Sequence, residues 1–251
     1  MASPLDGRLA LVTGASGGIG GAVAVALARA GADLALSYSG HRDDAETVAA
    51  TVSGLGRAAT TVQADLAAPG AARDLAERVT AVAGPVDVLV ANAGVGARLA
   101  WQDVDDETWE RTFAVNVTAV WQLTRALLPG MVERGFGRIL FVSSIAALNG
   151  GVVGPHYAAS KAALHGLMHH LAQRVAGSGV TVNTIAPALI TGTRMLSRML
   201  PGDDSPGSPA PAIPVGRRGR PEEIADMALA MLTNPYLTSK VITVDGGIYP
   251  T

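Results

Sequence analysis

Short apolar runs alternate along this chain with longer segments that have helical character. The run 86–90 is apolar apart from one aspartate, and such nearly continuous runs are typical of strands buried on both faces of a sheet. Strands separated by helices, such as the apolar segment 19–30, predict an α/β fold with a doubly wound, parallel, seven-stranded sheet. The seven predicted strands are Leu9–Val12, Leu34–Tyr38, Ala59–Gln63, Val86–Ala91, Ile139–Ser143, Val180–Ile185 and Val241–Val244.

The alternation continues without a linker, so residues 1–251 are expected to form a single domain. The least regular stretch is 189–219, which is rich in Gly, Ser and Pro. Its prolines exclude one long helix, although Thr193–Leu200 is compatible with a short one. These prolines are Pro201, Pro206, Pro209, Pro211 and Pro214.

The composition argues against two classes of partner. Hydrophobic residues make up 49% of the chain and charged residues only 16%, which is enough apolar material to cover both faces of a sheet. A formal net charge of −2 provides no basic footprint for a nucleic acid. No apolar run reaches the ~18–20 residues of a membrane span, because Arg29 and Asp33 interrupt the longest one. We therefore expect neither a nucleic acid nor a membrane as a partner.

The chain contains no cysteine, which excludes disulfides and thiolate metal sites and is compatible with a reducing cytosol. The segment 1–7 lacks the apolar core of a signal peptide, so a cytoplasmic location is expected.

His169 and His170 would point about 100° apart on a helix, without a further ligand at i+4 spacing. We predict no metal site.

A glycine-rich turn at residues 13–20 (TGASGGIG) connects the first predicted strand to the first predicted helix. Gly14, Gly18 and Gly20 permit a tight turn and a close approach of the backbone to a phosphate. The amino end of the following helix offers N–H groups and a positive dipole end to the same phosphate. The order of strand, turn and helix predicts a dinucleotide site, although the spacing differs from G-x-G-x-x-G.

Distinctive residues follow six of the predicted strands. Because ligands of doubly wound sheets bind outside the carboxyl ends of the strands, these residues predict one site at that edge. They are Thr13, Tyr38, Asp65, Asn92, Ser144 and Pro187.

Tyr157 and Lys161 are four residues apart, so on a helix they lie on one face, one turn apart. An ammonium about 5 Å from a phenol, at an effective dielectric of about 20, lowers the phenol pKa by about 2 units. Tyr157 would then be suited to proton transfer. Taken alone, the same spacing also fits an ordinary surface pair.

Together these motifs resemble the short-chain dehydrogenase/reductase family over nearly the whole chain, and most of all its 3-oxoacyl-carrier-protein reductases. The resemblance implies a Rossmann-type sheet, and a substrate lid at about 189–219. It rests on motifs that occur in the family's order: the glycine turn at 13–20, Asp65-Leu66, Asn92-Ala93-Gly94, Asn116, Ser144 thirteen residues before Tyr157, Tyr-x-x-x-Lys at 157–161, Asn183–Pro187 and Asp245-Gly246-Gly247.

The resemblance implies roles for four catalytic residues. Ser144 holds the substrate oxygen, and Tyr157 transfers the proton. Lys161 lowers the pKa of Tyr157 and binds the nicotinamide ribose, while Asn116 orders a water that links Lys161 to solvent. Considered singly, Ser144 also fits a strand-end turn residue, and Asn116 a helix amide bonded to backbone. The implied cofactor-binding residues are Gly14, Ser16, Gly18, Ile19, Gly20, Ser39, Arg42, Asp65, Leu66, Asn92, Ala93, Gly94, Tyr157, Lys161, Pro187 and Ile190.

The choice of nicotinamide cofactor depends on the end of the second predicted strand. NAD sites usually carry an acid there, about 20 residues beyond the glycine turn, to bind the ribose hydroxyl. No carboxylate occupies that position here, whereas Ser39 and Arg42 could hold a 2′-phosphate. Against this, Gly17 stands where many NADP-using relatives carry Lys or Arg. We favour NADP(H) and keep NAD(H) as the alternative.

The resemblance implies a carbonyl reductase that transfers a hydride between NADP(H) and a small-molecule ketone or secondary alcohol. The alternatives are a 3-oxoacyl-carrier-protein reductase, an NAD-dependent alcohol dehydrogenase and a non-catalytic nucleotide-binding regulator. The carrier-protein reductases bind their acidic carrier through two arginines. The matching positions here are Gly135 and Ser178, so both arginines are missing and a free ketone is the favoured substrate. Relatives of this shape usually form homotetramers, and a homotetramer or homodimer is expected.

Overall fold

A computed structural model describes residues 3–199 and 213–250. Within these residues seven strands form one sheet in the order β3-β2-β1-β4-β5-β6-β7, and every pair is parallel. This arrangement confirms the predicted doubly wound, seven-stranded parallel sheet. The strands are β1 (Leu9–Thr13), β2 (Asp33–Tyr38), β3 (Ala59–Gln63), β4 (Val88–Ala91), β5 (Gly137–Val142), β6 (Val180–Pro187) and β7 (Val241–Val244).

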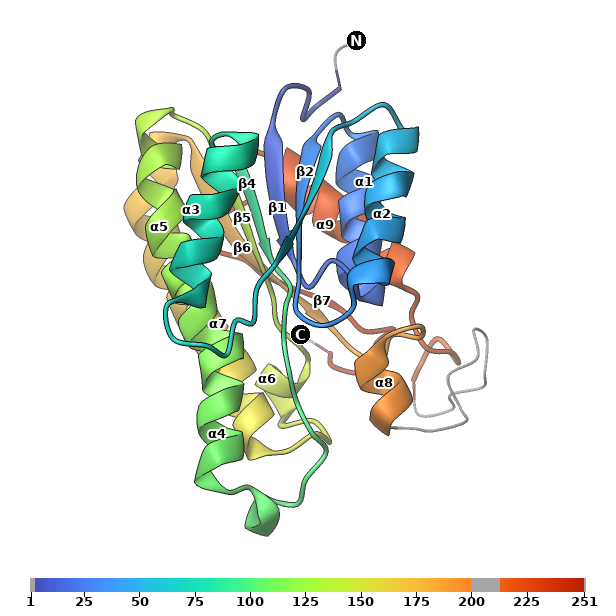
Figure 1. The fold of residues 1–251 in the computed structure, drawn as a ribbon. Coiled ribbons are helices and arrows are strands. Elements are labelled where there is room, and N and C mark those ends of the chain that lie inside the picture. Colours follow the sequence, from blue (N-terminus) through green and yellow to red (C-terminus); the bar gives the residue numbers. More distant parts are fainter. Residues whose placement is uncertain (1–2, 200–212, 251) are drawn as a thin grey trace.

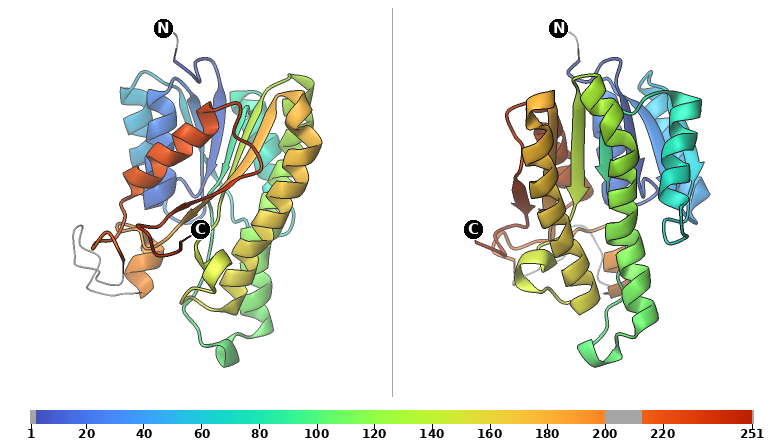
Figure 2. Two further views of the ribbon diagram at one scale, coloured as in Figure 1. Left: turned by 180° about the vertical axis from the view of Figure 1, so that it is seen from behind. Right: turned by 90° about the vertical axis from the view of Figure 1, so that its left-hand side faces the viewer.

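Helices cover both faces of the sheet (Figures 1 and 2), which explains why the central strands are almost entirely apolar. Every residue of β1, β4, β5 and β6 is buried. One face carries α1 (Gly18–Arg29), α2 (Arg42–Gly54) and α9 (Pro221–Thr233). The other face carries α3 (Ala71–Ala83), α5 (Ala119–Glu133) and α7 (Pro155–Val175). A separate apolar cluster fills the space between the sheet and each helical layer.

The remaining helices are short and lie toward the carboxyl ends of the strands (Figure 1). They are α4 (Asp106–Phe113), α6 (Ala146–Asn149) and α8 (Arg194–Met199). The short helix predicted at 193–200 therefore exists and begins at Arg194, whereas Leu200 lies outside the described residues. Four of the five prolines in the irregular stretch also lie outside them.

The helix that contains Asn116 differs from the prediction in one respect. Asn116 lies in a π-helical turn, Ala114–Thr118, inserted between α4 and α5. A π turn widens the hydrogen-bonding ring by one residue, and such insertions are frequent at functional sites. Apolar periodicity does not reveal a single inserted turn, which is why an ordinary helix was expected.

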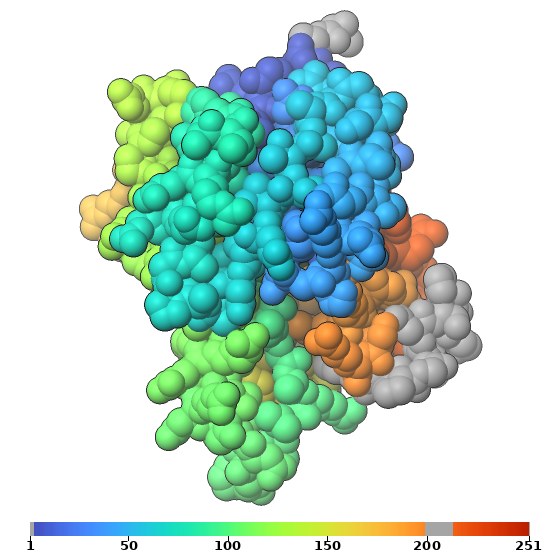
Figure 3. Space-filling model, in the orientation of Figure 1, coloured from blue at the N-terminus to red at the C-terminus, as the bar shows by residue number. Residues whose placement is uncertain are grey.

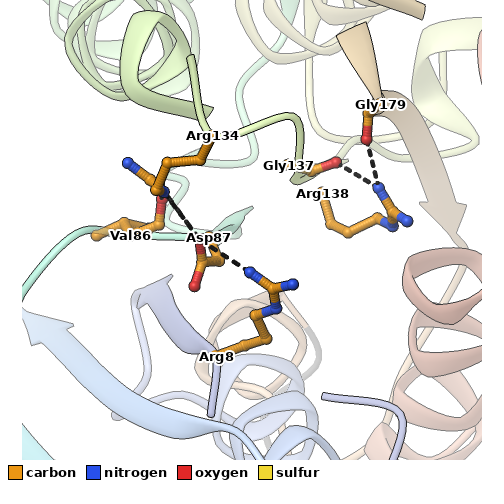
Figure 4. Close-up of polar contacts among 7 residues, drawn as sticks. All are labelled: Arg8, Val86, Asp87, Arg134, Gly137, Arg138 and Gly179. Atoms are coloured by element: carbon orange, nitrogen blue, oxygen red, sulfur yellow. Dashed lines mark hydrogen bonds and ion pairs between the residues drawn. The ribbon is translucent and has the colours of Figure 1, made fainter. Parts of the chain in front are cut away.

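Ion pairs and arginine stacking close the amino edge of the sheet (Figure 4). Asp87, buried at the start of β4, lies 3.2 Å from Arg134 and 3.7 Å from Arg8. The guanidinium of Arg138 donates to two backbone carbonyls and stacks on the ring of Phe136, with Arg8 also over that ring. Asp87 is thus paired with two arginines, and Arg138 is held by backbone carbonyls and the Phe136 ring.

Candidate active site

A cleft of about 320 Å³ opens at the carboxyl edge of the sheet. It includes the ends of β1 and β4. The strand order reverses between these two strands, because β2 and β3 lie on one side of β1 and β4 to β7 on the other. Doubly wound sheets bind ligands at this switch point. The predicted residues that line the cleft are Gly14, Ser16, Gly18, Ile19, Gly20, Ser39, Asp65, Leu66, Asn92, Ala93, Gly94, Ser144, Tyr157, Lys161, Pro187 and Ile190. Asn116 and Arg42 do not line it.

Hydrogen bonds tie the glycine turn to the end of β4. The hydroxyl of Thr13 accepts from the backbone N–H groups of Asn92 and Ala93, each at 3.0 Å. The Asn92 side chain donates in return to the carbonyl oxygens of Thr13 at 2.9 Å and Gly14 at 3.2 Å. The Asn92 amide therefore fixes the shape of the turn.

The glycines of the turn leave a space that side chains would fill. A Cβ on Gly20 would lie within 2.6 Å of the Asn92 side-chain nitrogen and closer still to the Gly14 carbonyl oxygen. A Cβ on Gly18 would lie 2.5 Å from the carbonyl oxygen of Gly192, and Gly14 has a φ of +65°. Together with the amino end of α1, this bare backbone fits the pyrophosphate of a dinucleotide.

Tyr157 and Lys161 project from the first turns of α7 into the cleft. Pro155 is the first residue of this helix, where its missing N–H removes no helical bond. The ammonium of Lys161 donates to the carbonyl oxygen of Val142, at the end of β5, at 2.9 Å. It lies 5.7 Å from the centre of the Tyr157 ring. The predicted pairing of the two side chains on one helical face is therefore present.

The pKa of Tyr157 shifts in the direction opposite to the prediction. Tyr157 and Lys161 are 6% and 3% exposed, and burial disfavours the charged form of each. Burial raises the pKa of Tyr157 to about 12, with a smaller opposing effect of the Ser144 hydroxyl. Burial also lowers the pKa of Lys161 to about 8. The sequence-based prediction was wrong because it counted the attraction of the charges without their desolvation.

Ser143 and Ser144 occupy different surroundings. The Ser143 hydroxyl donates to the Lys161 carbonyl oxygen at 2.9 Å and lies 3.0 Å from a ring nitrogen of His165. It therefore ties β5 to α7. The Ser144 hydroxyl accepts from the Ala146 N–H at 3.2 Å and interacts with Tyr157. Ser144 is thus the serine whose hydroxyl lies next to the phenol.

Asn116 is fully buried behind the wall of the cleft. Its side-chain oxygen accepts from the Val95 N–H at 2.9 Å, and its nitrogen donates to the Val95 carbonyl oxygen at 2.9 Å and the Ser160 hydroxyl at 3.0 Å. A Cβ on Gly94 would lie 3.0 Å from the Lys161 ammonium and 3.4 Å from the Asn116 oxygen. The two polar groups therefore come close to each other around Gly94.

A family model described as short chain dehydrogenase matches residues 8–203. The chain belongs to the short-chain dehydrogenase family. It is 38% identical to an acetoacetyl-CoA reductase of Rhizobium meliloti, over 96% of this chain and 98% of the relative. It is 36% identical to an L-rhamnose 1-dehydrogenase (NAD(P)(+)) of Sphingomonas sp., over 98% and 97%. A crystal structure of a 3-oxoacyl (acyl-carrier-protein) reductase from Agrobacterium tumefaciens C58 with NADP bound superposes with a TM-score of 0.88 at 35% identity, covering 97% and 95%.

In this short-chain dehydrogenase four residues at the end of β2 line the cleft, and none of them is a carboxylate. They are Tyr38, Ser39, Gly40 and His41. Arg42, which was predicted to bind the cofactor, points elsewhere. Its side chain is 74% exposed and lies 3.6 Å from Glu46, one turn further along α2.

Three residues at or beside the cleft were not identified by the sequence analysis. Gly96 does not line the cleft itself but packs against Tyr157, since a Cβ there would lie 2.6 Å from the Tyr157 ring. The second glycine in Gly94-x-Gly96 is the signal that could have revealed it. Arg194 and Met195 of α8 also line the cleft, but no sequence pattern connects them to the glycine turn.

The described part of the dehydrogenase contains no helix that is both long and apolar enough to span a membrane. In residues 3–199 and 213–250, no three His, Asp or Glu side chains converge in a way that could hold a metal ion. His169, one of the two adjacent histidines, lies on the exposed side of α7, and its ring is 2.9 Å from the Ser239 hydroxyl.

Proposed function

We propose that this short-chain dehydrogenase transfers a hydride between NADP(H) and a small-molecule ketone or secondary alcohol. One observation carries the proposal. Ser144, Tyr157 and Lys161 line the same cleft as the bare glycine turn. The turn would hold the pyrophosphate of a dinucleotide, and the three side chains would act beside its nicotinamide.

Each of the three side chains has a task that matches its chemistry. When bound, the nicotinamide supplies or accepts the hydride. The Ser144 hydroxyl orients the carbonyl or alcohol oxygen of the substrate. In reduction, the Tyr157 hydroxyl donates its proton to that oxygen, and burial keeps the phenol protonated until an alkoxide develops beside it. Lys161, held by the Val142 carbonyl, stabilises the phenolate that remains and binds the ribose.

The preference for NADP(H) rests on the end of β2. None of the residues at the end of β2 that line the cleft is a carboxylate. NAD sites usually have a carboxylate there, which accepts hydrogen bonds from the ribose hydroxyls. The A. tumefaciens structure contains NADP, and the name of the Sphingomonas enzyme includes both cofactors. NAD(H) is accordingly the second candidate.

The substrate that we favour is a free small molecule. The names of two relatives, an L-rhamnose 1-dehydrogenase and an acetoacetyl-CoA reductase, refer to small molecules, whereas the A. tumefaciens protein is named for a carrier-protein substrate. Gly135 and Ser178 provide no positive charge for an acidic carrier protein, and neighbouring Arg134 does not compensate. Its guanidinium donates to the Val86 carbonyl oxygen at 2.8 Å and pairs with Asp87 (Figure 4). A carrier-bound acyl chain is therefore the less favoured substrate.

Residues 189–219 are proposed as the substrate lid. Thr193, Met195 and Leu196 line the cleft from the side of α8, which supports a role in covering the substrate. Residues 200–212 of this stretch lie outside the described part of the chain.

A homotetramer or homodimer belongs to the same proposal. The cytoplasmic location stays a prediction, which cell fractionation would test.

The decisive experiment measures the absorbance of the reduced nicotinamide with purified enzyme against panels of ketones and secondary alcohols. Tyr157→Phe keeps the ring and its packing but removes the exchangeable proton. Turnover should fall by about 10²-fold or more, with the Kd for NADP⁺ little changed. Phe136→Leu, at the amino edge of the sheet against Arg8 and Arg138, serves as a packing control. Activity of Tyr157→Phe within a few-fold of wild type would contradict the assignment.

A further inference from the structure

We propose that Arg194, the first residue of α8, is the side chain that recognises the 2′-phosphate of the cofactor. This inference rests on the proposed NADP(H)-dependent function and names the residue that would select NADP(H) over NAD(H). In Figure 3, α8 (orange) lies against the lower end of α2 (blue). The Arg194 guanidinium extends from α8 to both the glycine turn and α2, and it is one of the residues that line the cleft.

Two hydrogen bonds hold the guanidinium in place. One terminal nitrogen, Nη2, donates to the carbonyl oxygen of Ser16 at 2.6 Å and to the carboxylate of Asp44 at 2.5 Å. These partners lie 178 and 150 residues away along the chain. The side chain is 35% exposed, in contrast to the 74% of Arg42. Arg194 is thus an anchored cation at the mouth of the cofactor cleft.

The position of this cation matches the place of the 2′-oxygen. In doubly wound dinucleotide folds the 2′-position of the ribose lies near the end of β2, where an acid selects NAD and an arginine accommodates NADP. The end of β2 and the residues up to His41 form this corner of the cleft, and α2 begins directly after them. Arg42 begins α2 but does not line the cleft. Arg194 lines it and contacts Asp44 in the first turn of the same helix.

The glycine turn leaves room for the guanidinium. A Cβ on Gly17 would lie 3.8 Å from Nη1 of Arg194, so a long side chain at this position would compete for the same space. The absence of a side chain at Gly17 lets a distant arginine supply the positive charge.

The guanidinium still has donors to offer. Both bonds that the structure gives use Nη2, so the N–H groups on Nη1 and Nε have no partner within residues 3–199 and 213–250. These donors can bind a phosphate in the paired geometry that makes arginine–phosphate contacts strong. Loss of one such charged contact typically weakens binding about 10- to 100-fold.

The test is a titration calorimetry series with NADP⁺, NAD⁺ and 2′,5′-ADP, which carries the 2′-phosphate but no nicotinamide. Arg194→Ala should weaken NADP⁺ and 2′,5′-ADP about 10- to 100-fold and change the NAD⁺ Kd less than threefold. Arg198→Ala, one turn further along α8 and exposed, is the matched control and should leave all three Kd values unchanged. Arg194→Lys, which keeps the charge without the fork, should fall between wild type and Arg194→Ala.

Three results would overturn the inference. Equal weakening of NADP⁺ and NAD⁺ by Arg194→Ala would assign the side chain to the pyrophosphate or to the lid. A selective loss with Arg42→Ala and none with Arg194→Ala would return the 2′-phosphate to Arg42. If wild-type protein binds NAD⁺ as tightly as NADP⁺, the cofactor choice and this inference both fail. Turnover with NAD(H) and its loss in Tyr157→Phe would still support the oxidoreductase function in that case.

Discussion

The buried pair of Tyr157 and Lys161 illustrates how residue-scale chemistry depends on surroundings. Helical spacing predicts correctly that the two side chains lie on one face. Desolvation, however, raises the pKa of the phenol and lowers the pKa of the ammonium. Both groups are therefore held closer to neutrality than in water, in a cleft that is to receive a charged cofactor. Binding of an anionic dinucleotide would favour the ammonium form of Lys161.

The lowered pKa of Lys161 predicts a pH-dependent stability. The pKa is 10.5 in the unfolded chain and about 8 in the native protein, so between these values the unfolded chain binds a proton that the native protein lacks. The free energy of unfolding contributed by this group therefore rises with pH from about 8 to 10.5. Its upper limit is about 3 kcal/mol. The raised pKa of Tyr157 contributes only above pH 10, where it acts in the opposite direction.

Urea denaturation of wild type and Lys161→Met at pH 7.5, 8.5 and 9.5 measures this effect. The variant carries no ionisable group, so the stability of the wild type relative to it should increase with pH. Parallel pH profiles of the two proteins would show that Lys161 is protonated in the native state throughout.

At the scale of elements, the glycine turn works because β1, α1 and the end of β4 come close together where the turn has no bulky side chain. The Thr13 and Asn92 hydrogen bonds join the end of β1 and the start of the turn to the end of β4, and α1 begins at the other end of the turn. Gly20 lies directly over this junction, where a Cβ would overlap the Gly14 carbonyl. The turn is therefore both a phosphate site and a packing point between α1 and β4.

Gly20→Ala is expected to lower the free energy of unfolding by about 1–3 kcal/mol through overpacking. It should also weaken NADP⁺ binding, because the displaced Gly14 carbonyl and Asn92 amide define the turn. Gly54→Ala at the end of α2 is the control, since a Cβ there meets nothing within 4 Å. That control should be neutral or stabilising by up to about 1 kcal/mol. Thermal melts and calorimetry with NADP⁺ check both; unchanged values for Gly20→Ala would contradict the role of the turn.

At the scale of the whole molecule, the two edges of the sheet have opposite characters. The amino edge is closed by paired charges around Asp87. The carboxyl edge holds the cleft, with α4 and α8 extending beyond the strands (Figure 1). The helical faces leave apolar area uncovered, since Trp109 on α4 and Trp121 on α5 are each 40% exposed. Exposed tryptophans of this kind are common at subunit interfaces.

Light scattering should therefore give a mass near four times the 25.4 kDa chain, or near twice it for a dimer. Deletion of residues 249–251 is expected to shift the equilibrium toward smaller species, because chain ends that are not held in an interface tend to fray. Thr251 lies outside the described residues, whereas the Tyr249 N–H donates to Asp245 at 2.8 Å. A monomeric, fully active protein at micromolar concentration would refute the assembly.

The sequence by itself determined those features that local patterns encode. The seven strands were predicted to within about two residues; for the central strands the signal is a continuous apolar run, because a strand buried on both faces tolerates few polar residues. The bare turn at Gly14–Gly20 and the spacing of Tyr157 and Lys161 are likewise local, and both motifs lie in the cleft.

Only the tertiary structure decided the features that depend on contacts across the chain. Desolvation of Tyr157 reflects every neighbour that packs around it, and this reversed the expected pKa shift. The π turn at Asn116 is stabilised in part by its bonds to Val95, on a different segment. Arg194 donates to Ser16, from which it is 178 residues away in the sequence. Arg42, which is close in sequence to the end of β2, has a side chain that is 74% exposed. Sequence distance carries no information on such contacts, because the energy of a charge depends on separation in space and on burial.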